Sequence, residues 1–322
     1  MLSGSFLYWQ SKVGNLEFAV VNRSITNPTP TTFTIDGKEF TPDFSWEPGY
    51  KVEMGYTTTY DNWDVLGRYT YYFGELTHIK RTLNSTLVPA GLGVAPLHFY
   101  PFIANPAPSP VYSYAHDKWQ MNYNFGDLEL GRFSLVNPFL KCRLFGGLKG
   151  GRISQSYKIE YGDGITLTNN NRLLQSNIAY KSTFWGIGPR VGANTSWKIV
   201  SSWNLLADSS FSLLFSRFNV ERRQIDQVLQ PGGTLATYTN TLPNKFFEVT
   251  PVLQMLLGTD FGICFGKINP LLMKFLLAYE LNYFFRQNQM RKFVTSSNPG
   301  DIKKLNGDLQ LHGLTFTLLF QY

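Results

Sequence analysis

Hydrophobic and polar residues alternate at every second position over the last ten residues of the chain. Leu314, Phe316, Leu318, Phe320 and Tyr322 share one parity, and small or polar residues fill four of the five positions of the other. Because successive side chains of a β-strand point to opposite faces, this segment predicts a strand with one apolar face and one mostly polar face. In a soluble sandwich, so long an apolar face would need a second sheet to cover it.

The same alternation recurs along the chain and predicts an all-β fold, an antiparallel transmembrane β-barrel of about ten strands. The apolar parity, which includes Trp119 and Tyr123, is expected to face lipid, and the opposite parity is expected to line the interior. If the apolar linkers 193–205 and 259–270 contain further strands, 12 or 14 strands also fit. The ten segments are 3–23, 50–56, 65–73, 119–125, 139–161, 176–192, 206–224, 247–255, 271–288 and 313–322.

Glycines mark two places where the alternation changes parity. One is Gly126, directly before Asp127, and the other is the pair Gly150 and Gly151. An extra residue in one strand shifts its later side chains to the opposite face, and glycine is common at such positions. We therefore expect β-bulges at both places.

Short connections alternate with long ones, as in barrels with short periplasmic turns and long extracellular loops. The longest, 75–116, contains six prolines, which do not fit a central strand, and an aromatic patch at 98–102. This patch predicts either a loop folded into the lumen as a constriction or a compact external loop packed on itself, and the second interpretation is preferred. The long connections are 24–43, 75–116, 162–175, 225–243 and 289–306.

Composition supports the barrel and one domain spanning 1–322. Aromatic residues make up 16% of the 322 residues, and the mean hydropathy of −0.15 suits strands that are apolar on one face only. No run of about 18 to 20 apolar residues predicts a spanning helix.

The terminal aromatic residue resembles the signal by which bacteria insert outer-membrane barrels. No secretory signal opens the chain, so we expect a mature form with an added Met1, located in the bacterial outer membrane.

Charges on the interior parity suggest a weak preference for anions. The interior parity contains twelve basic and seven acidic residues, and rings of Lys and Arg favour anions in pores. The pore-lining candidates are Lys51, Glu53, Arg68, Glu129, Lys141, Arg143, Lys149, Arg152, Lys181, Arg190, Arg217, Glu248, Lys274, Glu280 and Arg286, and the remaining members are Asp64, Lys158, Glu160 and Glu221. Alternatively, these charges pair with one another and fill a narrow barrel, because open channels are typical of 16 to 18 strands.

No pattern of catalytic, metal-binding or nucleic-acid-binding residues stands out. His78, His98 and His116 lie in or beside the longest connection, where solvated histidines are the simplest interpretation, and the known nucleophile motifs are missing. The glycine-rich run 146–152 lacks the ending of a phosphate-binding loop, and the basic residues form no stripe for nucleic acid. We therefore expect no enzyme activity, no cofactor and no metal. Cys142 and Cys264 are interpreted as inert thiols, although a disulfide between them would also fit an oxidising periplasm.

Several short motifs, in order along most of the chain, resemble the Legionella-type pore-forming major outer membrane proteins, a family also expanded in chlamydia-related bacteria. This resemblance implies an outer-membrane, pore-forming role and no catalytic residues. The motifs are at 6–10, 14–19, 44–52, 55–56, 60–64, 127–132 and 184–190.

The sequence thus predicts a pore for passive diffusion of small polar solutes or ions, in contact with outer-membrane lipid. The alternative is an adhesin or structural envelope barrel with a filled interior, which binds host or envelope ligands through its long loops. Both interpretations leave a homo-oligomer open.

Overall fold

The computed structural model describes most of the chain, with gaps in the longer connections. The described residues are 1–24, 36–59, 61–81, 94–96, 112–162, 167–168, 171–200, 202–230, 232–265, 271–293, 302–304 and 306–321. In this part of the chain every regular element is a strand, and no helix is long and apolar enough to cross a membrane.

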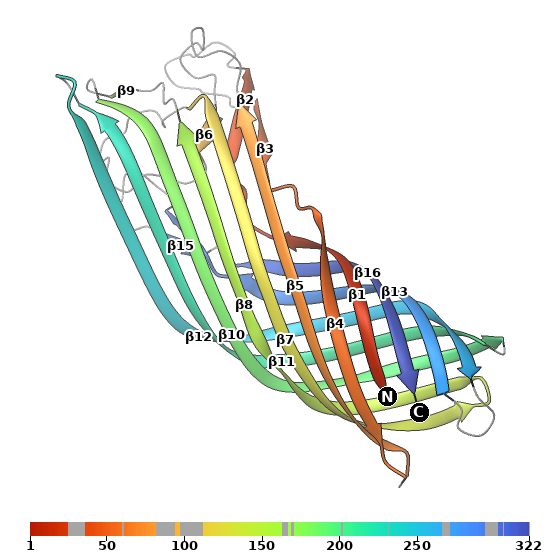
Figure 1. The fold of residues 1–322 in the computed structure, drawn as a ribbon. Coiled ribbons are helices and arrows are strands. Elements are labelled where there is room, and N and C mark those ends of the chain that lie inside the picture. The colour runs from red at the N-terminus through yellow and green to blue at the C-terminus, as the bar shows by residue number, and fades with distance from the viewer. Residues whose placement is uncertain are drawn as a thin grey trace.

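Ten long antiparallel strands close into a ring (Figure 1). Each strand pairs with its neighbours in chain order, and the last strand pairs with the first, from Leu2 opposite Phe320 to Val13 opposite Leu309. The predicted antiparallel barrel of ten strands is therefore confirmed. The strands are β1 (Leu2–Val13), β4 (Trp46–Thr57), β5 (Trp63–Arg81), β7 (Tyr114–Asn137), β8 (Leu140–Gly162), β10 (Asn171–Val200), β11 (Trp203–Leu229), β12 (Leu235–Phe265), β13 (Leu271–Asn288) and β16 (Gly307–Gln321).

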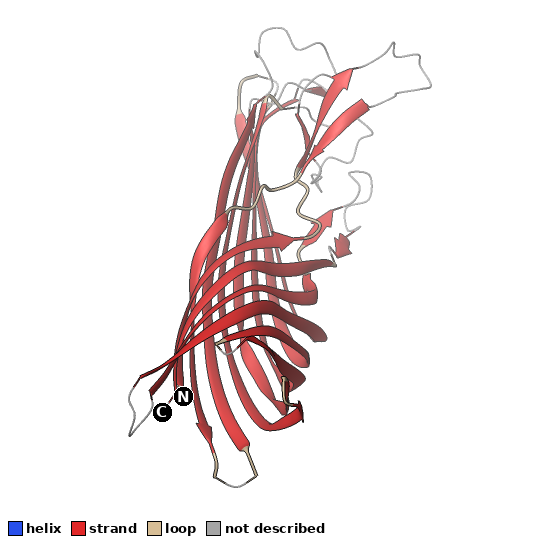
Figure 2. Ribbon diagram, turned by 90° about the vertical axis from the view of Figure 1, so that its right-hand side faces the viewer, coloured by secondary structure: helices blue, strands red, loops and turns tan. Residues whose placement is uncertain are grey.

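Short strands lie outside this ring. A three-stranded sheet lies at the end of the molecule opposite the termini (Figures 1 and 2). It divides the predicted strand 3–23, because β1 ends at Val13 and the chain turns at Asn15, where φ is 61°. The short strands are β2 (Ala19–Ser24), β3 (Asp36–Phe40) and β6 (Val94–Pro96) in that sheet, β14 (Arg291–Phe293) paired with β15 (Ile302–Lys304), and β9 (Leu167–Thr168) at the edge of β10.

Six neighbouring strands are much longer than a membrane requires. A transmembrane strand needs about 9–11 residues, whereas β10 has 30 and β12 has 31. Residues 193–200 and 259–265 extend β10 and β12, so they hide no additional strands. The predicted connection 225–243 is also mostly strand, because β11 runs to Leu229 and β12 starts at Leu235. Its turn uses Gly232 and Gly233, whose φ angles of 93° and 85° suit glycine.

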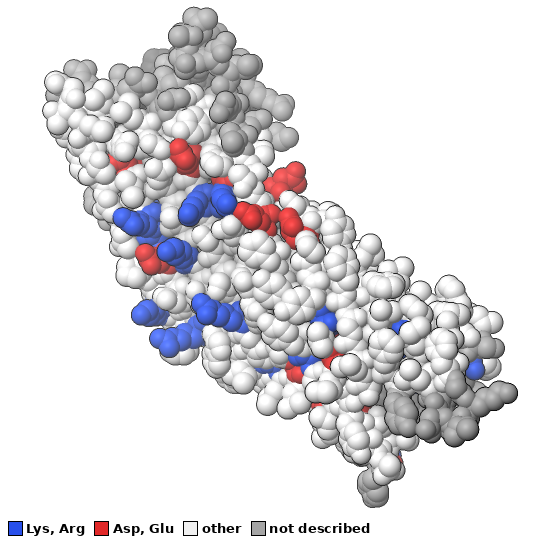
Figure 3. All heavy atoms as spheres, viewed as in Figure 1, with Lys and Arg blue, Asp and Glu red and all other residues white. Residues whose placement is uncertain are grey.

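The outward face of the ring near the termini is apolar. Tyr50, Met54, Leu277 and Phe316 are between 46% and 69% exposed, as the alternation predicts for side chains in contact with lipid. In Figure 3 the part of the visible face near the termini is mostly uncharged. The strands cross the membrane in this half of the molecule.

The projecting half of the molecule is the half beyond the membrane, away from the termini. There, apolar residues lie on the inward face of the strands and polar residues lie on the outward face. Trp119 and Tyr123, which the sequence predicts to face lipid, are 0% and 1% exposed inside the ring, whereas Leu128 on the same strand is 54% exposed. Strand β7 has no register shift at Gly126, and β8 has none at Gly150 and Gly151. The predicted bulges are therefore wrong. The same alternate positions of the strand face inward along its whole length. Apolar residues occupy the outward positions within the membrane and the inward positions above it.

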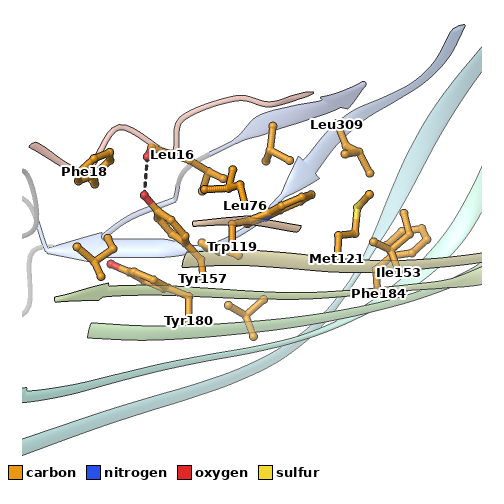
Figure 4. Packing of buried hydrophobic residues seen from close by; sticks show 14 of the residues in the cluster. Leu16, Phe18, Leu76, Trp119, Met121, Ile153, Tyr157, Tyr180, Phe184 and Leu309 are labelled. Atoms are coloured by element: carbon orange, nitrogen blue, oxygen red, sulfur yellow. Dashed lines mark hydrogen bonds between the residues drawn. The ribbon is translucent and has the colours of Figure 1, made fainter. Parts of the chain in front are cut away.

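A hydrophobic core fills the ring above the membrane (Figure 4). The segment between β1 and β2 covers it: the Tyr157 hydroxyl donates a hydrogen bond of 3.0 Å to the carbonyl of Leu16, and the Tyr161 hydroxyl donates one to the carbonyl of Phe18. Both tyrosines are fully buried. The projecting half is thus packed like the interior of a soluble protein.

Candidate functional site: the filled interior of the barrel

Arg143 on β8 pairs with two buried carboxylates in the membrane-spanning half. Its Nε lies 2.9 Å from both carboxylate oxygens of Asp64 on β5, and its Nη1 lies 2.9 Å from Oε2 of Glu129 on β7. These three residues are between 1% and 6% exposed. Bonds in which both partners are charged are roughly twice as strong as neutral ones, so Arg143 fastens three neighbouring strands from inside.

Further pairs extend this cluster around the wall. Arg190 Nε lies 3.1 Å from Glu129 Oε1, and Lys149 Nζ lies 3.0 Å from Asp127 Oδ1. Arg68 pairs with Glu53 and also lies 3.3 Å from Glu129. The complete charge network consists of Arg68, Arg143, Lys149 and Arg190 with Glu53, Asp64, Asp127 and Glu129, four cations and four carboxylates.

Strand register brings these charges together. Asp127 lies directly opposite Arg68 on one side and Lys149 on the other. Glu129 lies opposite Gly147, where an added Cβ would approach the carbonyl oxygen of Leu128 to 2.0 Å. Glycine at this position therefore permits the close approach of β7 and β8 beside the charge network.

Two more ion pairs lie apart from the charge network. Lys51 Nζ is 2.6 Å from Glu280 Oε1, and Lys274 Nζ is 3.0 Å from Asp260 Oδ2. The first pair joins β4 to β13, which are separated in the ring by β16 and β1, so it reaches across part of the lumen.

A small polar cavity remains between the ion pairs. Its volume is about 130 Å³, which is enough to hold water. Charged and polar side chains of the wall line it, among them Lys51, Glu53, Arg190, Asp208, Gln254 and Glu280.

Aromatic rings bridge the lumen above the membrane. The ring centroid of Phe284 on β13 lies 5.3 Å from that of Phe125 and 5.9 Å from that of Tyr123, both on β7. Strands β7 and β13 are not neighbours, because β5, β4, β1 and β16 separate them on one side of the ring. Phe184 on β10 packs against Phe125 from a third direction, at 6.4 Å. These contacts occupy the bore.

The predicted pore-lining residues divide into two groups. Ten lie on the inward face: Lys51, Glu53, Arg68, Glu129, Arg143, Lys149, Arg190, Glu248, Lys274 and Glu280. The other five are exposed instead: Lys141, Arg152, Lys181, Arg217 and Arg286. For Arg152, Lys181 and Arg217 the reason is the exchange of faces above the membrane, where polar residues point outward to water.

This division changes the charge balance of the interior. Within the membrane-spanning part that the structure describes, the charge network, the two further ion pairs and the half-buried Asp208 contain six cations and seven carboxylates. The sequence predicted a basic excess because it counted outward residues and overlooked Asp127, Asp208 and Asp260. Asp127 has the same parity as Glu129, which the sequence did place inside, so alternation between these two residues would have placed Asp127 inside as well.

The remaining sequence candidates form no reactive centre in the described part of the chain. His78 Nδ1 lies 3.6 Å from Asp117 Oδ1, and burial raises the pKa of Asp117 to about 7. No group of three or more His, Cys, Asp or Glu side chains among the described residues is placed to hold a metal ion. Cys142 and Cys264 are both free thiols. His98 and the aromatic patch 98–102 lie outside the described residues.

A closed antiparallel ring with an apolar outer face defines this chain as an outer-membrane β-barrel of a bacterium. The family model described as Legionella pneumophila major outer membrane protein precursor matches residues 1–322. The chain therefore belongs to this family, and it contacts membrane lipid.

Similarity to solved structures is low in sequence. The outer membrane protease OmpT from Escherichia coli is 11% identical, with 100% of this chain and 95% of that chain covered and a TM-score of 0.43. The toluene transporter TbuX from Ralstonia pickettii is 9% identical, with 98% and 88% covered and a TM-score of 0.19. No curated protein sequence matches the chain.

Proposed function

We propose that this protein is a structural barrel of the outer membrane with a filled lumen, which presents its projecting strands and long connections at the bacterial surface. The contact between Phe284 on β13 and Phe125 on β7 is the main support, because it joins strands from different sides of the ring. Ten strands also lie nearer to the eight that side chains just fill than to the 16 to 18 of open channels. The proposal includes no chemical reaction.

The second candidate is a narrow pore for small polar solutes. The polar cavity of about 130 Å³ below the aromatic rings favours it, and so does the resemblance to pore-forming major outer membrane proteins. An anion preference is no longer part of this candidate, because the charge network, the two further ion pairs and Asp208 together hold seven carboxylates and six cations.

Single-channel recording in a planar bilayer separates the two candidates. The folded, heat-modifiable wild-type barrel should give no discrete conductance steps. The triple variant Phe125→Ala, Phe184→Ala and Phe284→Ala removes rings that occupy the bore, and it should conduct. A matched variant that removes outward rings, Phe247→Ala, Phe285→Ala and Phe316→Ala, should stay silent.

Discrete steps from the wild-type barrel would overturn the filled-lumen proposal and support the pore. The reversal potential under a salt gradient would then report its selectivity, which should be close to neutral given the balanced interior charges.

A further inference from the structure

Six basic side chains point outward beyond the apolar band of the barrel, from its edge to about 20 Å farther along the strands. All six are exposed, and within the described part of the chain no carboxylate oxygen lies within 4.0 Å of their charged nitrogens. Figure 3 shows Lys and Arg gathered at mid-height on the visible face. The six residues are Arg152 and Lys158 on β8, Lys181 on β10, Arg217 and Arg223 on β11, and Lys245 on β12.

Strand register arranges two of these arginines in a row with aromatic residues. Trp185 on β10 lies opposite Arg152 on one side and Arg217 on the other, and Arg217 lies opposite Phe247 on β12. The arginine-aromatic row is therefore Arg152, Trp185, Arg217 and Phe247 across four neighbouring strands. Because neighbouring strands are about 4.8 Å apart, the two arginine backbones are about 10 Å apart.

Both aromatic members of the row are open to the surroundings. Trp185 is 52% exposed and Phe247 is 80% exposed. The Arg217 guanidinium lies over the Phe247 ring, 5.9 Å from its centroid. A cation beside an exposed ring suits a ligand that has both a charged and an apolar part.

The row marks the level at which the outward face changes from apolar to polar. On the side nearer the termini, the outward residues of the same four strands are apolar and exposed: Leu148, Ile187, Phe215 and Val249. On the other side they are Ser154, Thr183, Asn219 and Lys245. Aromatic residues gather where a barrel meets lipid headgroups, so the row lies at the headgroups of the outer leaflet.

Negative charge on this face begins at the level of Lys181, which lies directly opposite Glu221. Glu221 lies four residues beyond Arg217 on β11, and Glu160 lies eight residues beyond Arg152 on β8. Between the apolar band and that level, the charged outward residues of these four strands are all basic: Arg152, Arg217 and Lys245. Its charge complements an anion that is attached to the membrane.

We propose that the arginine-aromatic row, with Lys245, binds the phosphate groups of an anionic glycolipid of the outer leaflet. The guanidinium groups of Arg152 and Arg217 donate paired hydrogen bonds to phosphate oxygens, which arginine geometry favours. Trp185 and Phe247 contact the upper acyl chain. The site is independent of whether the lumen conducts, because all four side chains lie on the outside of the barrel.

Native mass spectrometry of the full-length folded barrel in detergent micelles, titrated with bisphosphorylated lipid A, tests the site. Each arginine removed should weaken binding about fivefold, the effect expected of one basic side chain beside an anionic surface, so Arg152→Gln with Arg217→Gln should weaken it about 30-fold. Dephosphorylated lipid A should bind weakly to the wild-type protein. Excess inorganic phosphate should compete poorly, because it lacks the acyl chains.

The matched control is Lys198→Gln, which removes an exposed cation from the opposite end of β10. It should leave lipid A binding unchanged, and heat-modifiability should confirm that every variant is folded. Equal affinity of the wild-type and double-arginine proteins would overturn the proposal. So would a protein dimer that the double substitution abolishes while lipid A binding persists, because the row would then be a contact between two copies of the chain.

Discussion

The stability of the membrane-spanning half depends strongly on single buried charges. Arg143→Met should destabilise the barrel by about 3–5 kcal/mol, because it leaves Asp64 and Glu129 charged and without their shared partner. The free energy of unfolding from urea titrations in detergent micelles measures this effect.

A surface ion pair provides the contrast. Arg132 Nη2 lies 2.7 Å from Asp61 Oδ1, but the two side chains are 49% and 45% exposed. Arg132→Met should therefore cost about 0–1 kcal/mol. Equal losses for the two variants would contradict the assignment of Arg143 to a buried cluster.

Asp117 should make stability depend on pH. Burial raises the pKa of its carboxyl group in the folded barrel to about 7, from an ordinary value of 3.8. The folded state therefore keeps a proton that the unfolded chain releases, so stability should fall as the pH rises from about 4 to about 7. The temperature at which half of the folded band on a gel converts to the unfolded form measures this fall.

The variant Asp117→Asn cannot lose that proton and should show a smaller fall. It should convert at a higher temperature than the wild-type protein at pH 8, and at nearly the same temperature at pH 4. Glu75→Gln, at a carboxylate in an exposed pair with Lys118, is the matched control and should follow the wild-type curve. If the conversion temperature of Asp117→Asn depends on pH as it does in the wild-type protein, Asp117 is not the group that causes this dependence.

At the scale of elements, the segment from Gly14 to Phe18 closes the top of the hydrophobic core. Tyr157 and Tyr161 hold the carbonyls of Leu16 and Phe18. Replacing both tyrosines with Phe should speed amide exchange in this segment about 5- to 30-fold, because each lost hydrogen bond contributes about 1 kcal/mol. Hydrogen-exchange mass spectrometry of a peptide containing Leu16 measures the change.

Tyr69→Phe is the control for this experiment. Its hydroxyl donates a 2.8 Å hydrogen bond to Asn124 on the outer face, far from the covering segment. Exchange at Leu16 should stay at the wild-type rate. Unchanged exchange in the double variant would mean that other contacts hold the segment in place.

At the scale of the whole molecule, closure of the ring joins residues from the two ends of the chain. Ser5 lies opposite Thr317, and their hydroxyl oxygens are 2.8 Å apart. In a background with Cys142 and Cys264 replaced by Ser, Ser5→Cys with Thr317→Cys should form a disulfide, because opposite Cβ atoms approach closely. A shifted band of the unfolded protein on a non-reducing gel detects it.

Ser11→Cys with Thr317→Cys tests the register. Ser11 faces Leu311, six residues along β16 from Thr317, which is about 20 Å. This pair should stay reduced under the same oxidant. A disulfide here, or none in the first pair, would contradict the closing register.

The alternation of apolar and polar residues was enough to predict the strands that cross the membrane. Around Tyr50, Leu277 and Phe316 the predicted outward face is the observed one, because lipid requires an apolar residue at every second position. This requirement concerns only neighbouring residues, so a short stretch of sequence is enough to detect it. The number of strands and the antiparallel order followed from the same pattern.

Above the membrane, the face that points into the ring could be identified only from the packed barrel. The local patterns around Trp119 and Arg152 are the same as those of membrane strands, with an apolar residue expected outside and a charged residue expected inside. Instead, Trp119 is buried in the core and Arg152 is exposed. The reason is that water surrounds the projecting half, whose interior is filled by apolar side chains from several strands. The charge network likewise joins residues as far apart as Asp64 and Arg143. Pairing at such separations depends on strand register around the closed ring, and no local pattern records it.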